Sequence, residues 1–232
     1  MYIPKLNPRL YKIAQLIPNC NTLADIGTDH AYLPVFLVSN GICKKAIASD
    51  IAEGPLKRAN NTVVSAGLSD KICLRKGEGL CTLSEKEADA VCIAGMGGLL
   101  ISKILNDGIS KLKAADTIIL QPMSAVSELR EFLYSNGWII KHEYLVKDTD
   151  KLYNILSVAL PDGRIIEYNN LDLLVGKNLI NDRSEHFNEY LKKIITKTNK
   201  KITGLERSSS CDLSELKNLR KIYNDLLDLE RN

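Results

Sequence analysis

The stretch from Thr22 to Pro34 constrains the fold more than any other part of this 232-residue chain. Leu23 to Ile26 is a short apolar run of the kind found in strands that are covered on both faces. Gly27 then lets the backbone turn without a Cβ in the way of a ligand, and residues 31–40 predict a helix that ends at Gly41. A strand that runs through a glycine turn into a helix begins a βαβ unit. Open α/β sheets bind ligands at the carboxyl ends of such strands, so we expect a site at this turn.

The same alternation of strand and helix continues to residue 160. Further strands are predicted over residues 45–51, 72–76, 90–94 and 117–121, and helices over residues 7–17, 55–66, 99–106 and 125–135. Two last strands, residues 138–146 and 152–160, are joined by a polar turn over residues 147–151 and predict an antiparallel hairpin. Parallel strands that end in a late hairpin favour an α/β domain that differs from the repeated dinucleotide fold.

The chain after Pro161-Asp162-Gly163 has a different pattern, because helical periodicity alone follows these turn residues. We therefore predict an α/β domain over residues 1–163 and a helical domain over residues 164–232. A connecting segment spans residues 171–180, a Ser-rich turn spans residues 204–211, and Asp212 with Glu215 is a capping pair. Two apolar stripes predict two antiparallel helices packed together: Tyr190, Leu191, Ile194, Ile195 and Ile202, then Leu213, Leu216, Leu219, Tyr223, Leu226 and Leu227.

Composition narrows the class of protein without identifying it. The chain is 45% hydrophobic, enough for a core, and its net charge of +3 is too small to indicate a nucleic-acid partner without a local cluster of cations. The chain lacks both a run of about 18 apolar residues and the apolar core of a signal peptide, so we expect a cytoplasmic protein with no membrane contact. Six cysteines without C-x-x-C spacing predict small core residues and no metal site.

Acidic residues at the first turn indicate the charge of the ligand. Asp25 precedes Gly27, and Asp29 and Tyr32 stand where the G-x-G-x-x-G pattern of dinucleotide folds would have later glycines. A pyrophosphate needs bare amides and disfavours a nearby carboxylate, whereas both acids would attract the sulfonium and ammonium groups of S-adenosylmethionine. For the adjacent His30, a substrate contact and a structural role are both open.

Three further strand ends carry candidate contacts. Asp50 follows Gly27 by a little over twenty residues, where a carboxylate accepts hydrogen bonds from ribose hydroxyls, although a helix-capping Asp is the alternative. Glu78 lies between two glycines and would accept from an adenine amino group, or else it occupies a surface turn. Residues 94–98 predict a strand-to-helix turn over which a flat base can lie. The Asn/Asp-Pro-Pro-Tyr/Trp motif of many adenine N6-methyltransferases is missing from the sequence, which disfavours N6 chemistry.

Five short motifs are placed at the ends of the predicted strands. They are Ala24-Asp25-Ile26-Gly27-Thr28-Asp29-His30-Ala31-Tyr32-Leu33-Pro34, Ala48-Ser49-Asp50-Ile51, Gly77-Glu78-Gly79-Leu80, Ala94-Gly95-Met96-Gly97-Gly98 and Leu120-Gln121-Pro122-Met123. Together they resemble the bacterial tRNA (adenine-22)-N1-methyltransferase family over nearly the whole chain, with Glu78 a departure where Asp is common. The resemblance implies a Rossmann-like class I methyltransferase domain with a C-terminal coiled coil. It also implies methyl transfer from S-adenosylmethionine to N1 of adenine 22 in the tRNA D-loop region.

The candidate site residues follow from these motifs and from local clusters of charge. We assign catalytic roles to Asp29, His30, Gly95 and Met96, with the Asp29 carboxylate stabilising the cation that forms when adenine N1 is methylated. Cofactor contacts are assigned to Asp25, Gly27, Thr28, Asp29, Tyr32, Asp50, Ile51, Gly77, Glu78, Gly79, Ala94 and Gly95. Candidate phosphate contacts to tRNA are Lys5, Arg9 and Lys12 near the first turn and Lys192, Lys193, Lys197, Lys200 and Lys201 in the tail, or else the tail lysines form a solvated face.

Two other functions share parts of this pattern. A nicotinamide-dependent oxidoreductase would use the same sheet and Asp50, but it should show a fuller glycine fingerprint and no acidic first turn. A non-catalytic nucleotide-binding adaptor that works through its coiled coil would leave three glycine-rich strand ends unexplained. We expect a monomeric enzyme with tRNA as its partner and no metal.

Overall fold

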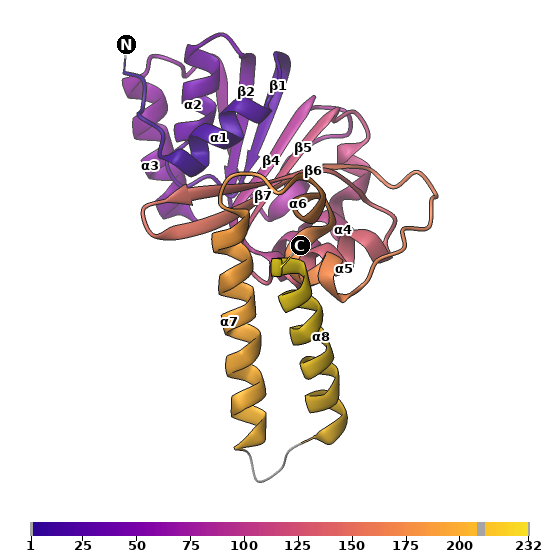
Figure 1. Cartoon of the computed structure of the whole chain (residues 1–232). Helices are drawn as coiled ribbons and strands as arrows, with labels where there is room; N and C mark the ends of the chain where they lie inside the picture. The colour runs from indigo at the N-terminus through magenta and orange to yellow at the C-terminus, as the bar shows by residue number, and fades with distance from the viewer. Residues whose placement is uncertain (1, 208–211, 232) are drawn as a thin grey trace. The chain divides into compact units, whose positions relative to one another are not determined.

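The computed structural model describes residues 2–207 and 212–231, and the chain divides into two compact units, Met1–Ile166 and Glu167–Asn232. The first unit contains the sheet and the second is helical (Figure 1). The sequence pattern placed the change of structure at Gly163, where a turn has positive φ.

The first unit is built on a seven-stranded mixed sheet of order β3-β2-β1-β4-β5-β7-β6. Five strands are parallel, and β7 and β6 run antiparallel to close one edge. Ile26 pairs with Ser49, so the residues that follow β1 and β2 emerge side by side at the carboxyl edge. The strands are β1 (Cys20–Ile26), β2 (Cys43–Asp50), β3 (Ile72–Lys76), β4 (Ala90–Gly97), β5 (Thr117–Ser124), β6 (Ile139–Asp148) and β7 (Lys151–Ala159).

Helices cover both faces of this sheet (Figure 1). One core cluster joins the first three helices to the central strands through buried side chains such as Ile13, Leu37, Val63 and Leu23. The α/β architecture predicted from the sequence is confirmed, including the late antiparallel hairpin. The helices are α1 (Pro8–Leu16), α2 (Tyr32–Ser39), α3 (Glu53–Ser65), α4 (Gly98–Gly108) and α5 (Val126–Ser135).

The predicted turn over residues 94–98 is wrong, because β4 continues to Gly97. Gly95 has φ +81° and forms a bulge, after which pairing with β5 resumes at Met96 and Pro122. β5 accordingly runs three residues beyond its predicted end. The hairpin turn is also shorter than predicted, because Asp148 and Lys151 still pair.

The cysteines do not all lie in the core. Cys43 and Cys92 are buried as predicted, but Cys73 and Cys81 are exposed, so the prediction is wrong for these two. Cys211 lies outside the described residues.

The second unit contains the two predicted tail helices, α7 (Phe187–Glu206) and α8 (Leu213–Arg231), after a short π-helical segment, Asp172–Gly176, and α6 (Lys177–Asp182). The Asp212 carboxylate accepts from the amides of Ser214 and Glu215, so the predicted cap is present. α7 and α8 pack side by side, and a coiled coil as such is not established. Leu213 is 77% exposed and does not belong to the predicted stripe, and residues 208–211 of the predicted turn lie outside the described chain. The buried residues of the pair are Phe187, Leu191, Thr198, Ile202, Leu216, Ile222 and Leu226.

Candidate active site

A cavity of about 400 Å³ lies at the carboxyl ends of β1 and β4. The β1–α2 turn forms one wall, the Gly95 bulge forms another, and Arg9 of α1 contributes a third. This is the edge at which α/β sheets bind ligands. The lining residues are Asn7, Arg9, Leu10, Asp25, Gly27, Thr28, Asp29, His30, Ala31, Tyr32, Leu33, Ala94, Gly95 and Met123. The cavity thus brings together eight of the predicted catalytic and cofactor residues: Asp25, Gly27, Thr28, Asp29, His30, Tyr32, Ala94 and Gly95.

Several amides of the β1–α2 turn are already hydrogen-bonded within the protein. The N–H groups of Gly27 and Thr28 both donate to the Ser49 carbonyl at 2.8 Å, and the Ala31 N–H donates to the Thr28 hydroxyl at 3.1 Å. A pyrophosphate at this turn would need those amides for itself. The turn therefore does not fit a dinucleotide, in agreement with the acidic residues beside it.

Asp25 is a buried carboxylate in the wall of the cavity. Its pKa is raised from 3.8 to about 6, chiefly by burial and to a small extent by the charge of Asp50, while a hydrogen bond with Thr28 and the nearby Arg9 guanidinium oppose the increase. The carboxyl group is therefore mostly ionised at neutral pH, although its burial makes the ionised form unfavourable in free energy. A bound cation would relieve the cost, so the cavity fits a positively charged ligand better than an anion.

Asp29 lies at the rim of the same cavity, where its carboxylate contacts the side chains of Arg58 and His30. Arg58 of α3 donates to Asp29 Oδ1 from Nε at 2.9 Å and also from Nη2, and His30 Nε2 lies 3.4 Å from Oδ2. The His30 ring stacks on Tyr32 with centroids 4.9 Å apart. Arg58 is a site residue that the sequence analysis missed, since nothing local connects it with a carboxylate 29 positions earlier.

Met96 does not belong to the lining of the cavity. Its Sδ–Cε end reaches across to β1, and a Cβ on Gly27 would lie 1.9 Å from Met96 Cε. The interpretation that Gly27 leaves room for a ligand is therefore wrong in its reason, because Met96 fills that space. The structure gives Met96 a packing role at the turn.

The neighbouring strand ends carry the remaining predicted cofactor residues. Asp50 Oδ1 accepts from the Ala52 N–H at 2.7 Å, and Ile51 is 64% exposed beside it. The residue at the N-cap of α3 is Ala52, so Asp50 is not the helix-capping Asp of the predicted alternative. Glu78 forms an exposed ion pair with Lys103 at 2.9 Å. None of these three predicted residues lines the cavity itself.

The glycines that flank Glu78 also have a packing explanation. A Cβ on Gly77 would lie 2.7 Å from the Thr82 methyl group, and one on Gly79 would lie 3.0 Å from Ile104. These contacts account for both glycines within the protein itself, so their presence does not require an adenine ring.

Arg9 lies in the wall of the cavity, although its predicted role was a phosphate contact. Its Nη1 donates to Gln121 Oε1 at 2.5 Å, and its guanidinium lies 5.8 Å from the centre of the Tyr153 ring. Of the other two cations predicted near the turn, Lys12 lies 4.5 Å from the Tyr144 ring centre and Lys5 is exposed.

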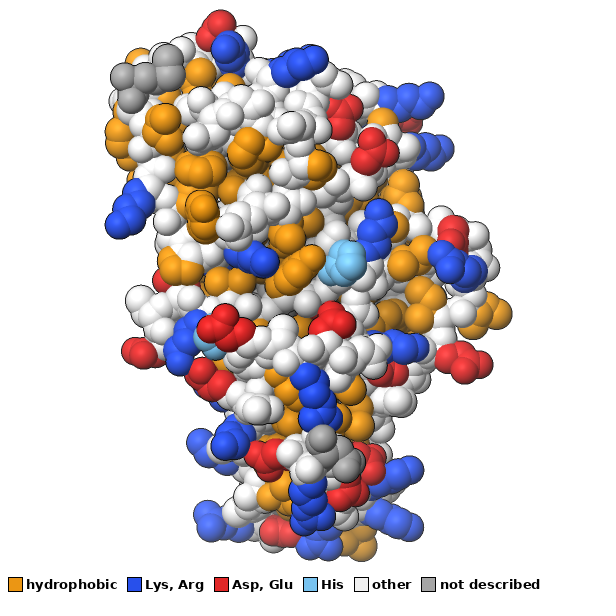
Figure 2. Space-filling model, turned by 45° about the horizontal axis from the view of Figure 1, so that its top comes forward, with side chains coloured by type: hydrophobic (Ala, Val, Ile, Leu, Met, Phe, Trp, Pro, Cys, Tyr) orange, Lys and Arg blue, Asp and Glu red, His pale blue; other side chains and the backbone are white. Residues whose placement is uncertain are grey.

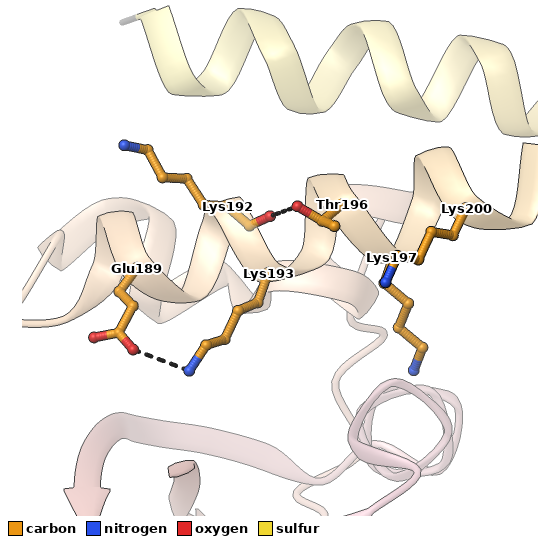
Figure 3. Close-up of a pocket in the computed structure, with 6 residues that line it drawn as sticks. All are labelled: Glu189, Lys192, Lys193, Thr196, Lys197 and Lys200. Atoms are coloured by element: carbon orange, nitrogen blue, oxygen red, sulfur yellow. Dashed lines mark hydrogen bonds and ion pairs between the residues drawn. The ribbon is translucent and has the colours of Figure 1, made fainter. Parts of the chain in front are cut away.

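The tail lysines form a cluster of a different kind. All five are exposed, and a shallow hollow of about 420 Å³ on α7 is lined by Glu189, Lys192, Lys193, Thr196, Lys197 and Lys200 (Figure 3). Lys193 pairs with Glu189 at 2.9 Å, and Lys201 lies outside the hollow. Figure 2 shows both signs of charge mixed over the helices of this unit.

The described part of the chain contains neither a metal-binding cluster nor a membrane-spanning helix. In residues 2–207 and 212–231, His, Cys, Asp and Glu side chains do not gather in groups of three or more that could hold a metal ion. Over the same residues, every helix is too short or too polar to cross a membrane.

The fold and the cavity define a methyltransferase, and a family model described as a methyltransferase domain matches residues 6–156. The chain is 41% identical over 172 residues to the tRNA (adenine(22)-N(1))-methyltransferase of Bacillus subtilis, covering 74% of this chain and 72% of that one. It belongs to the tRNA (adenine(22)-N(1))-methyltransferase family.

Solved structures agree over the full length. The B. subtilis m1A22 tRNA methyltransferase TrmK has 33% identity and a TM-score of 0.87, covering 97% of this chain and 99% of that one. Streptococcus pneumoniae Sp1610 in complex with S-adenosyl-L-methionine has 31% identity and a TM-score of 0.84, covering 97% of this chain and 100% of that one. The helical unit is therefore part of the same architecture in those relatives. The oxidoreductase and adaptor alternatives find no support in these comparisons.

Proposed function

We propose that this chain methylates N1 of adenine 22 in tRNA with S-adenosylmethionine as the methyl donor. The observation that carries the proposal is the cavity in which Asp25, Gly27 and Gly95 meet, in a chain of this family. The acidic wall fits the charge of the donor, and the Gly27 and Thr28 amides of the β1–α2 turn are already bonded to the Ser49 carbonyl.

Different residues would bind different groups of S-adenosylmethionine. Asp25 offers a buried carboxylate to a cationic group, and Asp50, whose Oδ1 already accepts from Ala52, has its second oxygen for ribose hydroxyls. The exposed Ile51, which follows Asp50, would cover a face of an adenine ring. When bound, S-adenosylmethionine supplies an electron-deficient methyl group.

Adenine N1 has a free lone pair at neutral pH, so the protein does not need to remove a proton from it. Its main task is to hold the base in line, which makes positioning the largest contribution. The methylated ring is a cation, and we assign its stabilisation to the Asp29 carboxylate at the rim. N1 lies on the pairing edge of the base, so the nucleotide has to turn out of the folded tRNA into the cavity.

The test is methylation of defined RNA. Protein and S-adenosylmethionine are incubated with a tRNA transcript that has adenine at position 22 and with the same transcript carrying guanine there, and nucleosides are measured by mass spectrometry. We expect 1-methyladenosine from the first transcript alone. Equal product from both, or N6-methyladenosine from either, would contradict the assignment.

We propose that the exposed lysines of α7 bind tRNA phosphates. We also propose that the protein acts on tRNA in the cytoplasm as a monomer. Replacing Lys192, Lys197 and Lys200 by Ala should weaken tRNA binding and lower the slope of log K against log salt by somewhat under one per lost contact. The matched control replaces Lys217 and Lys221, which are exposed on α8. Parallel slopes for all three proteins would show that the α7 lysines only keep the helix soluble.

A further inference from the structure

Gln121 is a polar side chain in the middle of an apolar strand. It has 0% exposure in β5 and lies between Leu120 and Pro122, which are also buried. A buried amide is retained in a protein core where its polar atoms are hydrogen-bonded, because leaving them unbonded is costly. The hydrogen-bond partners of Gln121 therefore indicate its structural role.

Both ends of the Gln121 amide are occupied. Oε1 accepts from Arg9 Nη1 at 2.5 Å and from the Gly95 N–H at 3.1 Å. Nε2 donates to the Pro122 carbonyl at 2.8 Å and lies 3.6 Å from Met123 Sδ. One side chain thus joins α1, β4 and β5 at the point where all three reach the cavity.

The bond to Gly95 is explained by the bulge. Ala94 pairs with Gln121 and Met96 pairs with Pro122, so Gly95 is an extra residue with no partner in the strand ladder. Its N–H would be left without an acceptor in this part of the sheet, and the Gln121 side chain supplies one. The left-handed backbone at Gly95, which lines the cavity, is therefore fixed by a residue that does not line it.

The bond to Arg9 fixes the opposite wall. The Arg9 guanidinium lies 5.8 Å from the Tyr153 ring centre, and its Nη1 is 4.0 Å from where a Cβ on Gly95 would lie. A long side chain that bonds to Gln121 through one nitrogen and also lies over an aromatic ring has lost much of its freedom. Gln121 thereby sets the separation between Arg9 and Gly95.

We propose that Gln121 is a positioning residue of the methyl-transfer site, which aligns the target base by holding the Gly95 bulge and the Arg9 guanidinium in register. This role rests on the proposed function. It does not require a contact between Gln121 and any substrate. Neither Asp25 nor Asp50 bonds to Gln121, and Gln121 reaches Asp25 only through the charge of Arg9, so cofactor affinity should depend on it much less than kcat does.

The first test compares two substitutions. Gln121→Leu keeps the volume of the side chain but removes the acceptor, and we expect kcat to fall about 100-fold, since a misplacement of about 1 Å costs that much. Gln121→Glu keeps an acceptor for Arg9 and Gly95, and we expect kcat within about tenfold of the parent protein. A residue that only fills the core would give the opposite order, because Leu suits an apolar core and Glu does not. The affinity for S-adenosylmethionine, measured by calorimetry, should change less than about tenfold in both.

The second test is independent of methylation. Hydrogen exchange of the Gly95 amide, followed by NMR on the free protein, should be slow in the parent and in Gln121→Glu and at least tenfold faster in Gln121→Leu. Asn154→Leu is the matched control, since Asn154 is a buried amide on β7 that donates to Glu143 Oε1 and not to a cavity residue. It should lower stability without changing kcat or Gly95 exchange.

The outcomes separate the two proposals. An active parent protein with equal kcat in Gln121→Leu, or with an unchanged Gly95 amide, would overturn the role of Gln121. If Gln121→Leu does not fold, loss of both kcat and Gly95 protection in Gln121→Glu overturns it instead. An inactive parent protein would refute the proposed function, while the exchange result would still decide whether Gln121 holds the bulge.

Discussion

Replacing Asp25 by Asn should make the protein more stable and less able to bind its cofactor. The carboxylate has a pKa of about 6 in the folded protein, chiefly because it is buried, against 3.8 in the absence of the fold. This difference corresponds to roughly 3 kcal/mol of folding free energy that the ionised group costs at high pH. The cost is absent below pH 3.8, grows as the pH rises through the interval up to about 6, and is constant above it.

The difference in unfolding free energy between Asp25→Asn and the parent protein is the quantity to measure. Urea denaturation at several pH values between 4.5 and 7.5 should give a difference that is about 2 kcal/mol larger at pH 7.5 than at pH 4.5. Effects of the new amide on packing are the same at every pH and cancel from this comparison. Asp116→Asn, on the exposed residue before β5, is the control for loss of one carboxylate from the chain.

Two results would refute this reasoning. A stability difference that is the same at every pH would mean that burial of Asp25 does not govern its ionisation. A gain in stability with unchanged affinity for S-adenosylmethionine would mean that the carboxylate is not used for the cofactor. The combination we expect, a more stable protein with weaker binding, is typical of groups that are held in an unfavourable state for function.

Three other substitutions test separate parts of the structure. Asp50→Ala should weaken binding of S-adenosylmethionine by about 1 to 3 kcal/mol through loss of a charged acceptor, as measured by calorimetry, and unchanged affinity in a folded variant would remove Asp50 from the site. Asp29→Asn should lower turnover more than it lowers tRNA affinity. The loss of turnover should not exceed about tenfold, because the Arg58 guanidinium already pairs with the Asp29 carboxylate. Steady-state kinetics in which tRNA affinity falls more than turnover would assign Asp29 to binding. Glu143→Gln should lower the free energy of unfolding, measured by urea denaturation, by about 3 kcal/mol, because the buried Arg130 guanidinium loses its carboxylate partner. A loss under about 1 kcal/mol would show that this ion pair contributes little to stability.

Features that depend on residues close together in the sequence could be predicted, and contacts between distant residues could not. The strand that leads to Gly27, the helix after it and the cap at Asp212 follow from local patterns that any chain with these residues would share. Arg58 meets Asp29, and Met96 meets Gly27, only because the parallel sheet brings separate strand ends together. The sequence therefore located the edge of the sheet at which the site lies, while the partners of its charged groups required the structure.

Two bulges determine features of the sheet that local patterns do not indicate. An inserted residue shifts the alternation of a strand by one, and every side chain beyond it changes face. In β6 the register shifts between Ile140 and His142, so that Ile140, Glu143 and Leu145 are all buried, although simple alternation from Ile140 places Glu143 in solvent. The bulge is thus what brings the Glu143 carboxylate to Arg130, at 2.5 Å.

The bulge at Gly95 acts in the same way at the active site. Three glycines within residues 95–98, after the five apolar residues 90–94, predict a turn, because a glycine with positive φ ordinarily ends a strand. The strand continues here because Gln121 accepts the hydrogen bond that Gly95 cannot give to the ladder. The signal in the sequence was Gln121 itself, since a polar residue inside an apolar strand needs a partner that the strand does not supply. Gln121 and Glu143 are each the one strongly polar buried residue of their strand, and each marks a place where the ladder departs from regular pairing.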